Sequence, residues 1–174
     1  MIKKHLFPLF IAVILLICGC STSPNYRTPV RFYYPNIQPV YNDPDGLISY
    51  QFSEGDSLTN EQILTNYLQG PEDLNFYNPF PQDVRLVSLK EKDLMVTVML
   101  SNAFAELSGI DATLAAVCLA KTSMELMDAD TVAITCESAL IDGEQTLIFN
   151  KNQILWQDTS IGLVTEATNT TPTQ

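Results

Sequence analysis

The pattern of apolar and polar residues predicts six strands between residues 30 and 149. Apolar side chains at every second position, as at Ile48, Tyr50 and Phe52, are typical of a strand. The polar segment 90–93 separates two strands and predicts a hairpin. The expected strands are 30–34, 47–52, 84–89, 94–100, 131–136 and 146–149, the last facing the short segment 138–140 across a turn at Asp142–Gly143.

Two helices are expected, and each has recognisable end signals. The first begins after Thr59, which forms a capping box with Gln62 three residues later, and Gly70–Pro71 ends it. The second begins at Asp111, reaches about Met127, and carries so many apolar residues that we expect it to be largely buried. The buried stripe predicted for the first helix consists of Ile63, Leu64, Tyr67 and Leu68.

The expected elements follow the order β-β-α-β-β-α-β-β. Strand pairs separated by single helices predict an α+β fold with one domain. We expect a mostly antiparallel or mixed sheet with the two helices packed on one face. The strand 94–100 has apolar residues on both faces, which predicts a central place in that sheet.

The N-terminal segment predicts export and attachment to a membrane. Lys3 and Lys4 precede an apolar run at 6–17, which is typical of an export signal and shorter than the roughly 20 residues that span a bilayer. An aliphatic residue three positions before a cysteine, with Gly19 directly before it, resembles a bacterial lipobox. The resemblance implies diacylglycerol transfer to the thiol of Cys20 and cleavage after Gly19. An uncleaved signal anchor is the alternative.

The chain is expected to have four parts. Residues 1–19 are the lipoprotein signal peptide, and residues 20–29 comprise the lipidated Cys20 and a polar tether. Residues 30–157 form one folded domain of ordinary size. Residues 158–174 are a Thr-rich polar tail with little to bury. The mature protein is therefore expected on the cell membrane, lipid-anchored and facing outside the cytoplasm.

The charge of the chain excludes some partners. The net charge is −11, and removal of residues 1–19 takes away Lys3 and Lys4. Seven basic residues then stand against 20 acidic ones, which gives −13. Such a charge repels nucleic-acid phosphates and anionic lipid headgroups. We therefore expect no nucleic-acid partner, and a membrane contact made through the lipid on Cys20.

Few residues suited to catalysis are present. The single histidine, His5, lies in the leader, so the processed chain has none for a Ser-His-Asp, Cys-His or zinc site. The segment 42–46 lacks the spaced ligands and terminal Glu of a calcium loop. Four acidic pairs lie in predicted turns or at element ends, where solvated turn residues are the usual interpretation. We expect no catalytic residue, cofactor or metal; the pairs are Asp43/Asp45, Glu72/Asp73, Asp128/Asp130 and Asp142/Glu144.

Two cysteines, Cys118 and Cys136, remain in the predicted domain. Export permits a disulfide between them. Each also lies where a small buried thiol is ordinary. The sequence leaves both alternatives open.

Aromatic residues are concentrated in the N-terminal half of the domain. Core packing is the usual role of such residues. The alternative is a sugar- or peptide-binding platform in the proline-rich loop that holds Phe76, Tyr77 and Phe80, because loop aromatics are frequent at interfaces.

Several segments resemble the GerMN domain, the sporulation and germination domain of Gram-positive bacteria. The helix end 63–71, with Gly70–Pro71, is similar to the LLxGP element of that family. Residues 80–89 and 94–104 resemble two of its strands, although Met99 stands where an Asp is common. The resemblance extends from about Val30 to Gly143. It implies a non-catalytic module with a fold similar to ring-building modules of secretion and sporulation assemblies.

The sequence therefore predicts a membrane-anchored lipoprotein that acts as a binding or assembly module in the cell envelope, with envelope proteins as partners. The resemblance places this role in sporulation or germination. The alternative is a peptidoglycan-associated enzyme or an accessory factor of cell-wall remodelling, for which peptidoglycan is the ligand.

Overall fold

The computed structural model describes residues 29–39, 46–53 and 58–154. The predicted signal peptide, Cys20 and the Thr-rich tail lie outside these residues. The elements are β1 (Val30–Pro35), β2 (Ile48–Ser53), α2 (Asn60–Tyr67), β3 (Leu86–Lys92), β4 (Met95–Leu100), the 3-10 helix η1 (Asn102–Glu106), α3 (Gly109–Met127), β5 (Thr131–Cys136) and β6 (Leu147–Asn150). The predicted order of strands and helices is confirmed.

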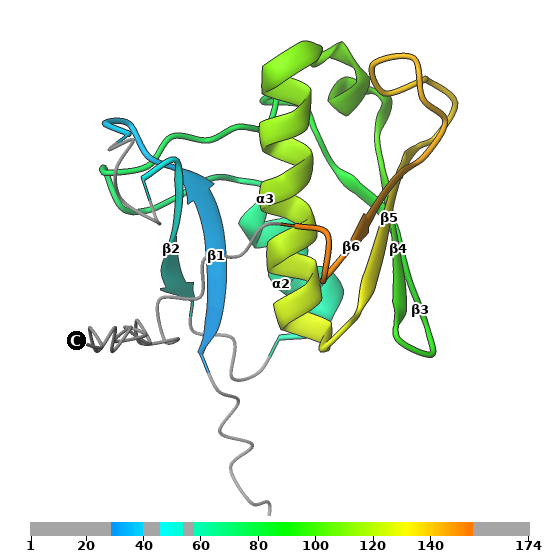
Figure 1. The fold of residues 1–174 in the computed structure, drawn as a ribbon, viewed down its shortest axis with the longest axis horizontal. Helices are drawn as coiled ribbons and strands as arrows, with labels where there is room; N and C mark the ends of the chain where they lie inside the picture. The colour runs from blue at the N-terminus through cyan, green and yellow to red at the C-terminus, as the bar shows by residue number, and fades with distance from the viewer. Residues whose placement is uncertain (1–28, 40–45, 54–57, 155–174) are drawn as a thin grey trace, which may run out of the picture.

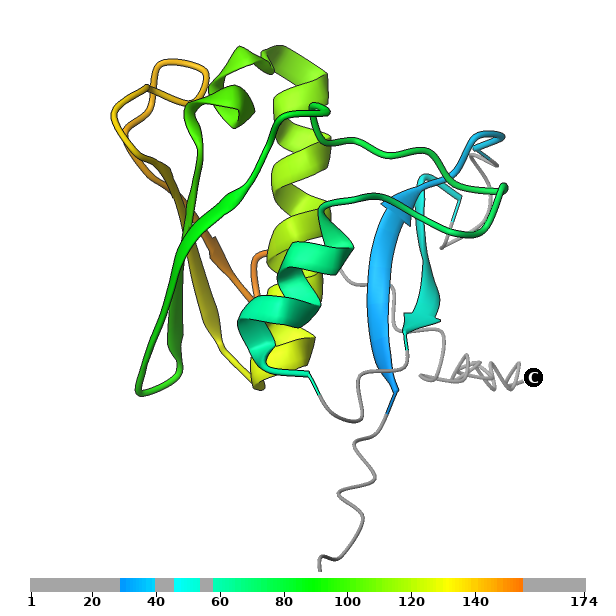
Figure 2. The ribbon, with the colours of Figure 1, turned by 180° about the vertical axis from the view of Figure 1, so that it is seen from behind.

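The domain has an α+β fold with three layers. A four-stranded sheet has the order β3-β4-β5-β6, and β1 and β2 form a separate antiparallel pair. Helix α3 stands between this pair and the four-stranded sheet, and α2 lies beside α3 (Figures 1 and 2). One cluster of buried residues joins β1, both helices and the sheet. These elements therefore share one core, as expected for a single domain.

The separate β1–β2 pair, which we call the ribbon, differs from the expectation of one sheet. Its position follows from the composition of α3, which is apolar around most of its circumference. A helix of this kind must be covered on more than one side. The sheet covers one side of α3, and the ribbon covers another.

The four-stranded sheet is mixed. Strand β4 pairs antiparallel with β3 and parallel with β5, and β5 pairs antiparallel with β6. The predicted hairpin and the predicted central place of β4 are both confirmed. Its residues Val96, Val98 and Leu100 are fully buried on the helix side. The parallel β4–β5 pair needs a long crossover, and α3 provides it.

Local signals at the ends of α2 act as predicted. The backbone N–H of Gln62 donates to Thr59 Oγ1 at 3.3 Å, and the N–H of Thr59 donates to Gln62 Oε1 at 2.9 Å. These bonds satisfy two donors that the helix itself leaves unpaired. The predicted stripe is buried, and it consists of Ile63, Leu64, Tyr67 and Leu68.

Helix α3 begins at Gly109, two residues before the predicted start, and ends at Met127. Asp128 follows in the left-handed conformation, with a φ of 47°. Among the helices of the described residues, none has the length and apolar character required to cross a bilayer.

We expect Gly70→Ala to destabilise the domain by about 2–3 kcal/mol. Gly70 has a φ of 105°, and a Cβ there would lie 2.9 Å from Asn78 Cγ. The Asn78 side chain is held because its Oδ1 accepts a hydrogen bond from the N–H of Phe80 at 3.1 Å. Urea unfolding measures the loss.

The control for this variant is Gly143→Ala. Gly143 also has a positive φ, 89°, but a Cβ there would meet no atom within 4 Å. We expect it to lose only about 1 kcal/mol, from backbone strain alone. If both variants lost the same free energy of unfolding, the contact with Asn78 would make no contribution to the effect of Gly70→Ala.

Candidate functional site

Strand β1 has its outer edge covered by neighbouring elements. The N–H of Tyr33 donates to Thr122 Oγ1 on α3 at 3.0 Å, and the Tyr67 hydroxyl on α2 donates to the carbonyl of Tyr33 at 2.8 Å. The carbonyl of Pro35 accepts from the N–H of Tyr77 at 3.1 Å. The nitrogen of Pro35 lies on the same side of β1 as that of Tyr33, which is the side away from β2. The missing N–H of Pro35 therefore removes no hydrogen bond between β1 and β2, and proline is tolerated here.

Strand β2, in contrast, presents an open edge. Tyr50 pairs with Tyr33 in the register, and the backbone groups of Tyr33 point away from β2. In an antiparallel pair, the partner residue must then point its own N–H and C=O outward. The same alternation applies to Ile48 and Phe52. Within the described part of the chain, no third strand pairs with this edge.

Rings and cations form a continuous series on one face of the ribbon. The Tyr33 and Tyr50 ring centroids are 5.7 Å apart, and those of Tyr50 and Phe52 are 5.4 Å apart. Arg31 Cζ lies 4.9 Å from the Tyr50 centroid, and Lys121 Nζ of α3 lies 4.5 Å from that of Tyr33. We call these five residues the ribbon face. Its outermost ring, Phe52, is 60% exposed.

The chemistry of the ribbon face suits binding more than proton transfer. The Tyr33 hydroxyl donates to Glu125 Oε2 at 2.9 Å, and Glu125 Oε1 lies 3.6 Å from Arg31 Nε. The pKa of Tyr33 is raised well above its ordinary value, mainly by burial and secondly by the negative charge of Glu125. This tyrosine therefore stays protonated at neutral pH and serves as a fixed hydrogen-bond donor.

Further apolar side chains are exposed at one end of the ribbon. Ile37, Leu47 and Leu74 are all more than half exposed. Their segments lie side by side, because the N–H of Asn36 donates to the carbonyl of Leu47 and the N–H of Ile37 donates to the carbonyl of Asn75. Exposed apolar groups gathered around an open strand edge are typical of an interaction surface.

For the loop that holds Phe76, Tyr77 and Phe80, the structure favours core packing, the usual role, over the alternative of a platform made of all three rings. Phe80 is buried against Tyr67 and Phe104, and Phe76 is half-buried beside Tyr34. Core packing is therefore the role of these two rings, and only Tyr77 remains exposed. Nothing in the sequence distinguishes Tyr50 and Phe52 as surface rings. Their alternate spacing predicts that both rings lie on the same face of the strand. It does not predict whether another element covers that face.

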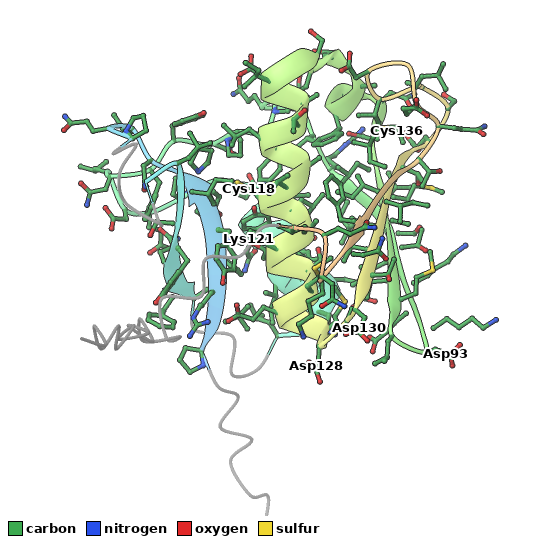
Figure 3. All side chains as sticks on the ribbon, in the orientation of Figure 1. Asp93, Cys118, Lys121, Asp128, Asp130 and Cys136 are labelled. Atoms are coloured by element: carbon green, nitrogen blue, oxygen red, sulfur yellow. The ribbon has the colours of Figure 1, made fainter. Side chains whose placement is uncertain are left out.

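The acidic pairs that the structure describes lie in turns or at element ends. Glu72 and Asp73 are exposed, and Asp73 Oδ1 accepts from the N–H of Asn75 at 2.9 Å. Asp128 and Asp130 follow the end of α3 (Figure 3). Asp142 and Glu144 belong to a tight turn closed between Ile141 and Glu144. Asp43 and Asp45 lie outside the described residues. Among the described residues, no group of three or more His, Cys, Asp or Glu side chains could hold a metal ion.

Cys118 and Cys136 are both free thiols. Cys118 lies on α3 and Cys136 on β5, well apart in Figure 3. Burial raises the pKa of Cys118 to about 12, and burial also raises the pKa of Cys136. Thiols of this kind are poor nucleophiles at neutral pH. Of the two alternatives, the structure has the unbridged one.

Comparisons with known proteins agree with this architecture. The family model Germane, described as sporulation and spore germination, matches residues 31–142. The tandem GerMN domains of the sporulation protein GerM from Bacillus subtilis are 20% identical with a TM-score of 0.51, covering 68% of this chain and 43% of that chain. The first GerMN domain of the same protein is 15% identical with a TM-score of 0.51, covering 71% and 96%.

This chain thus spans less than half of the tandem structure. No curated protein matches it. The two solved structures show a shared fold, and the family model covers well over half of the chain. The resemblance predicted from Gly70–Pro71 and the neighbouring strands is confirmed: the chain belongs to the Germane family of sporulation and spore germination domains.

Proposed function

We propose that this chain is a non-catalytic, lipid-anchored binding or assembly module of the cell envelope, with a role in sporulation or germination. It acts through protein–protein contacts made by the ribbon. The observation that carries this proposal is the open edge of β2 beside the exposed rings of Tyr50 and Phe52.

An open strand edge has a defined way of binding. An extended segment of a partner adds to the edge, so that backbone hydrogen bonds give affinity and alternate side chains give specificity. Here the alternate positions Ile48, Tyr50 and Phe52 would contact that segment. Edge strands are usually protected against pairing by charged residues or proline. Strand β2 has the sequence Ile-Ser-Tyr-Gln-Phe-Ser, which contains neither.

The alternative function is that of an enzyme or accessory factor acting on peptidoglycan. Glycosidase chemistry needs two carboxyl groups on opposite walls of a cleft, about 5–9.5 Å apart. The acidic pairs described above are local to their turns, and this favours the binding module. The discriminating experiment incubates the purified protein with cell-wall sacculi. Release of soluble muropeptides by a preparation free of contaminating hydrolases would contradict the non-catalytic proposal.

We expect Phe52→Lys to weaken partner binding by about 2 kcal/mol, roughly 30-fold, because exposed aromatic anchors dominate interfaces. Phe52 is 60% exposed, so the change leaves folding stability within about 0.5 kcal/mol. The measurement is co-purification of envelope proteins with the tagged lipoprotein, identified by mass spectrometry. The control is Ile148→Lys, which introduces the same charge at a 59% exposed position of β6. If both variants lost partner binding equally, the proposal that the ribbon makes the contact would be wrong.

A further inference from the structure

A second surface feature lies away from the ribbon face, between the loop that joins α2 to β3 and the N-terminal part of α3. Figure 2 shows this loop passing α3 on its way to β3. It is a hollow of about 480 Å³, within the range of about 300–1,000 Å³ usual for ligand sites. Its apolar walls come from three segments of the chain. They consist of Tyr77, Pro79, Phe80, Pro81, Leu107 and Leu114.

Two carboxylates, from Glu106 of η1 and Asp111 of α3, also line the hollow, and no lining residue is basic. Neither carboxylate belongs to the ion pairs that join Arg31 with Glu125 and Lys151 with Asp128. The hollow therefore combines negative charge with apolar walls.

The neighbourhood adds to this negative charge. Asp142 Oδ2 accepts a hydrogen bond from the N–H of Gly109 at 3.3 Å, which brings a third carboxylate to the start of α3. The N-terminus of a helix contributes only about half a positive charge. The combined negative charge of three carboxylates, those of Glu106, Asp111 and Asp142, is several times larger than this partial positive charge.

The ring of Tyr77 lies close to one of the carboxylates. Tyr77 is 41% exposed. Burial, followed by the charge of Asp111, raises its pKa. A cation placed here is attracted by the quadrupole of the aromatic ring and by the negative charge of the carboxylates. A ligand that fits needs a positive end group on a hydrocarbon stem.

We propose that this hollow binds an arginine or lysine side chain of a partner polypeptide. The stem packs against Pro79, Leu107 and Leu114, while the cation lies over the Tyr77 ring and donates hydrogen bonds to Glu106 and Asp111. This proposal rests on the proposed binding function, because that function supplies a polypeptide as the partner. The hollow is a second contact site, separate from the ribbon face.

The test uses the full lipidated protein in nanodiscs and the rhodamine-labelled peptide Gly-Leu-Arg-Leu-Gly. Fluorescence anisotropy measures the dissociation constant. Two further peptides carry Lys or neutral citrulline in place of Arg. We expect Asp111→Asn to weaken binding of the Arg peptide about tenfold, because it removes a charged acceptor. Glu144→Gln removes one charge from the nearby turn 141–144 without touching the hollow, and it should leave the affinity within about twofold.

The outcomes are distinct. Binding of the Arg and Lys peptides, with about tenfold weaker binding of the citrulline peptide, supports the proposal. Equal binding of Arg and citrulline peptides, an Asp111→Asn variant that binds like the wild type, or no binding of the Arg peptide at 1 mM would overturn it. Phe52→Lys is expected to leave peptide binding unchanged, so failure of the ribbon proposal and failure of this one can be told apart.

Discussion

Leu68→Asp is expected to unfold the domain. Leu68 is 3% exposed and belongs to the buried stripe of α2. Truncating a buried leucine costs about 2–5 kcal/mol, and burying an unpaired carboxylate adds to this. The new negative charge would also lie at the C-terminal end of the helix, where the helix dipole disfavours it. Because small domains have about 5–15 kcal/mol of stability in total, a loss above about 5 kcal/mol leaves little native protein.

Circular dichroism and two-dimensional NMR of the purified protein measure this effect. Asn66→Asp is the matched control, because it introduces the same charge at an exposed position two residues earlier in α2. The control should keep a native spectrum and a cooperative thermal transition. A Leu68→Asp variant that melts like the control would contradict the packing of α2.

Cys20→Ala is expected to abolish membrane attachment. The lipobox resemblance predicts that the thiol of Cys20 accepts diacylglycerol and that cleavage after Gly19 follows that transfer. Two acyl chains give stable anchoring where a single chain gives marginal binding. Metabolic labelling with a fatty-acid analogue should therefore mark the wild type and not the variant. The variant should remain as an uncleaved precursor or appear in the medium.

Cys18→Ala is the control for this variant, because it removes the neighbouring thiol and leaves Cys20 in place. It should keep both label and membrane attachment. The labelled wild type should also resist a high-salt wash, which releases proteins held by charge alone. Label on the Cys20→Ala protein, or release of the wild type by salt, would contradict the lipid anchor.

Features fixed by short-range signals could be predicted from the sequence. The capping box at Thr59 and Gln62 and the glycine at position 70 depend only on their neighbours, and the first helix was accordingly placed well. The sequence places the start of α3 two residues late, at Asp111. The observed N-cap residue, Ser108, makes no side-chain capping hydrogen bond. The apolar residues on both faces of β4 also predicted its central place correctly.

Features that depend on long-range packing could not be predicted in this way. The sequence pattern of β1 and β2 fits one joint sheet as well as a separate ribbon, and the choice depends on how α3 is covered. For the same reason, the exposure of individual rings could not be predicted: Phe80 of the proline-rich loop is 5% exposed, and Phe52 at the end of a strand is 60% exposed. Whether an aromatic residue is core or surface is decided by elements distant in sequence.

Site-specific photocrosslinking tests the central claim most directly. The photoreactive amino acid p-benzoylphenylalanine replaces Phe52 in the full chain expressed in its own cells, and in a second strain it replaces Ile148, which is similarly exposed. After irradiation, we predict a discrete adduct with an envelope protein from position 52 and none of the same mass from position 148. No adduct at position 52, or the same adducts from both positions, would contradict a partner bound at the ribbon.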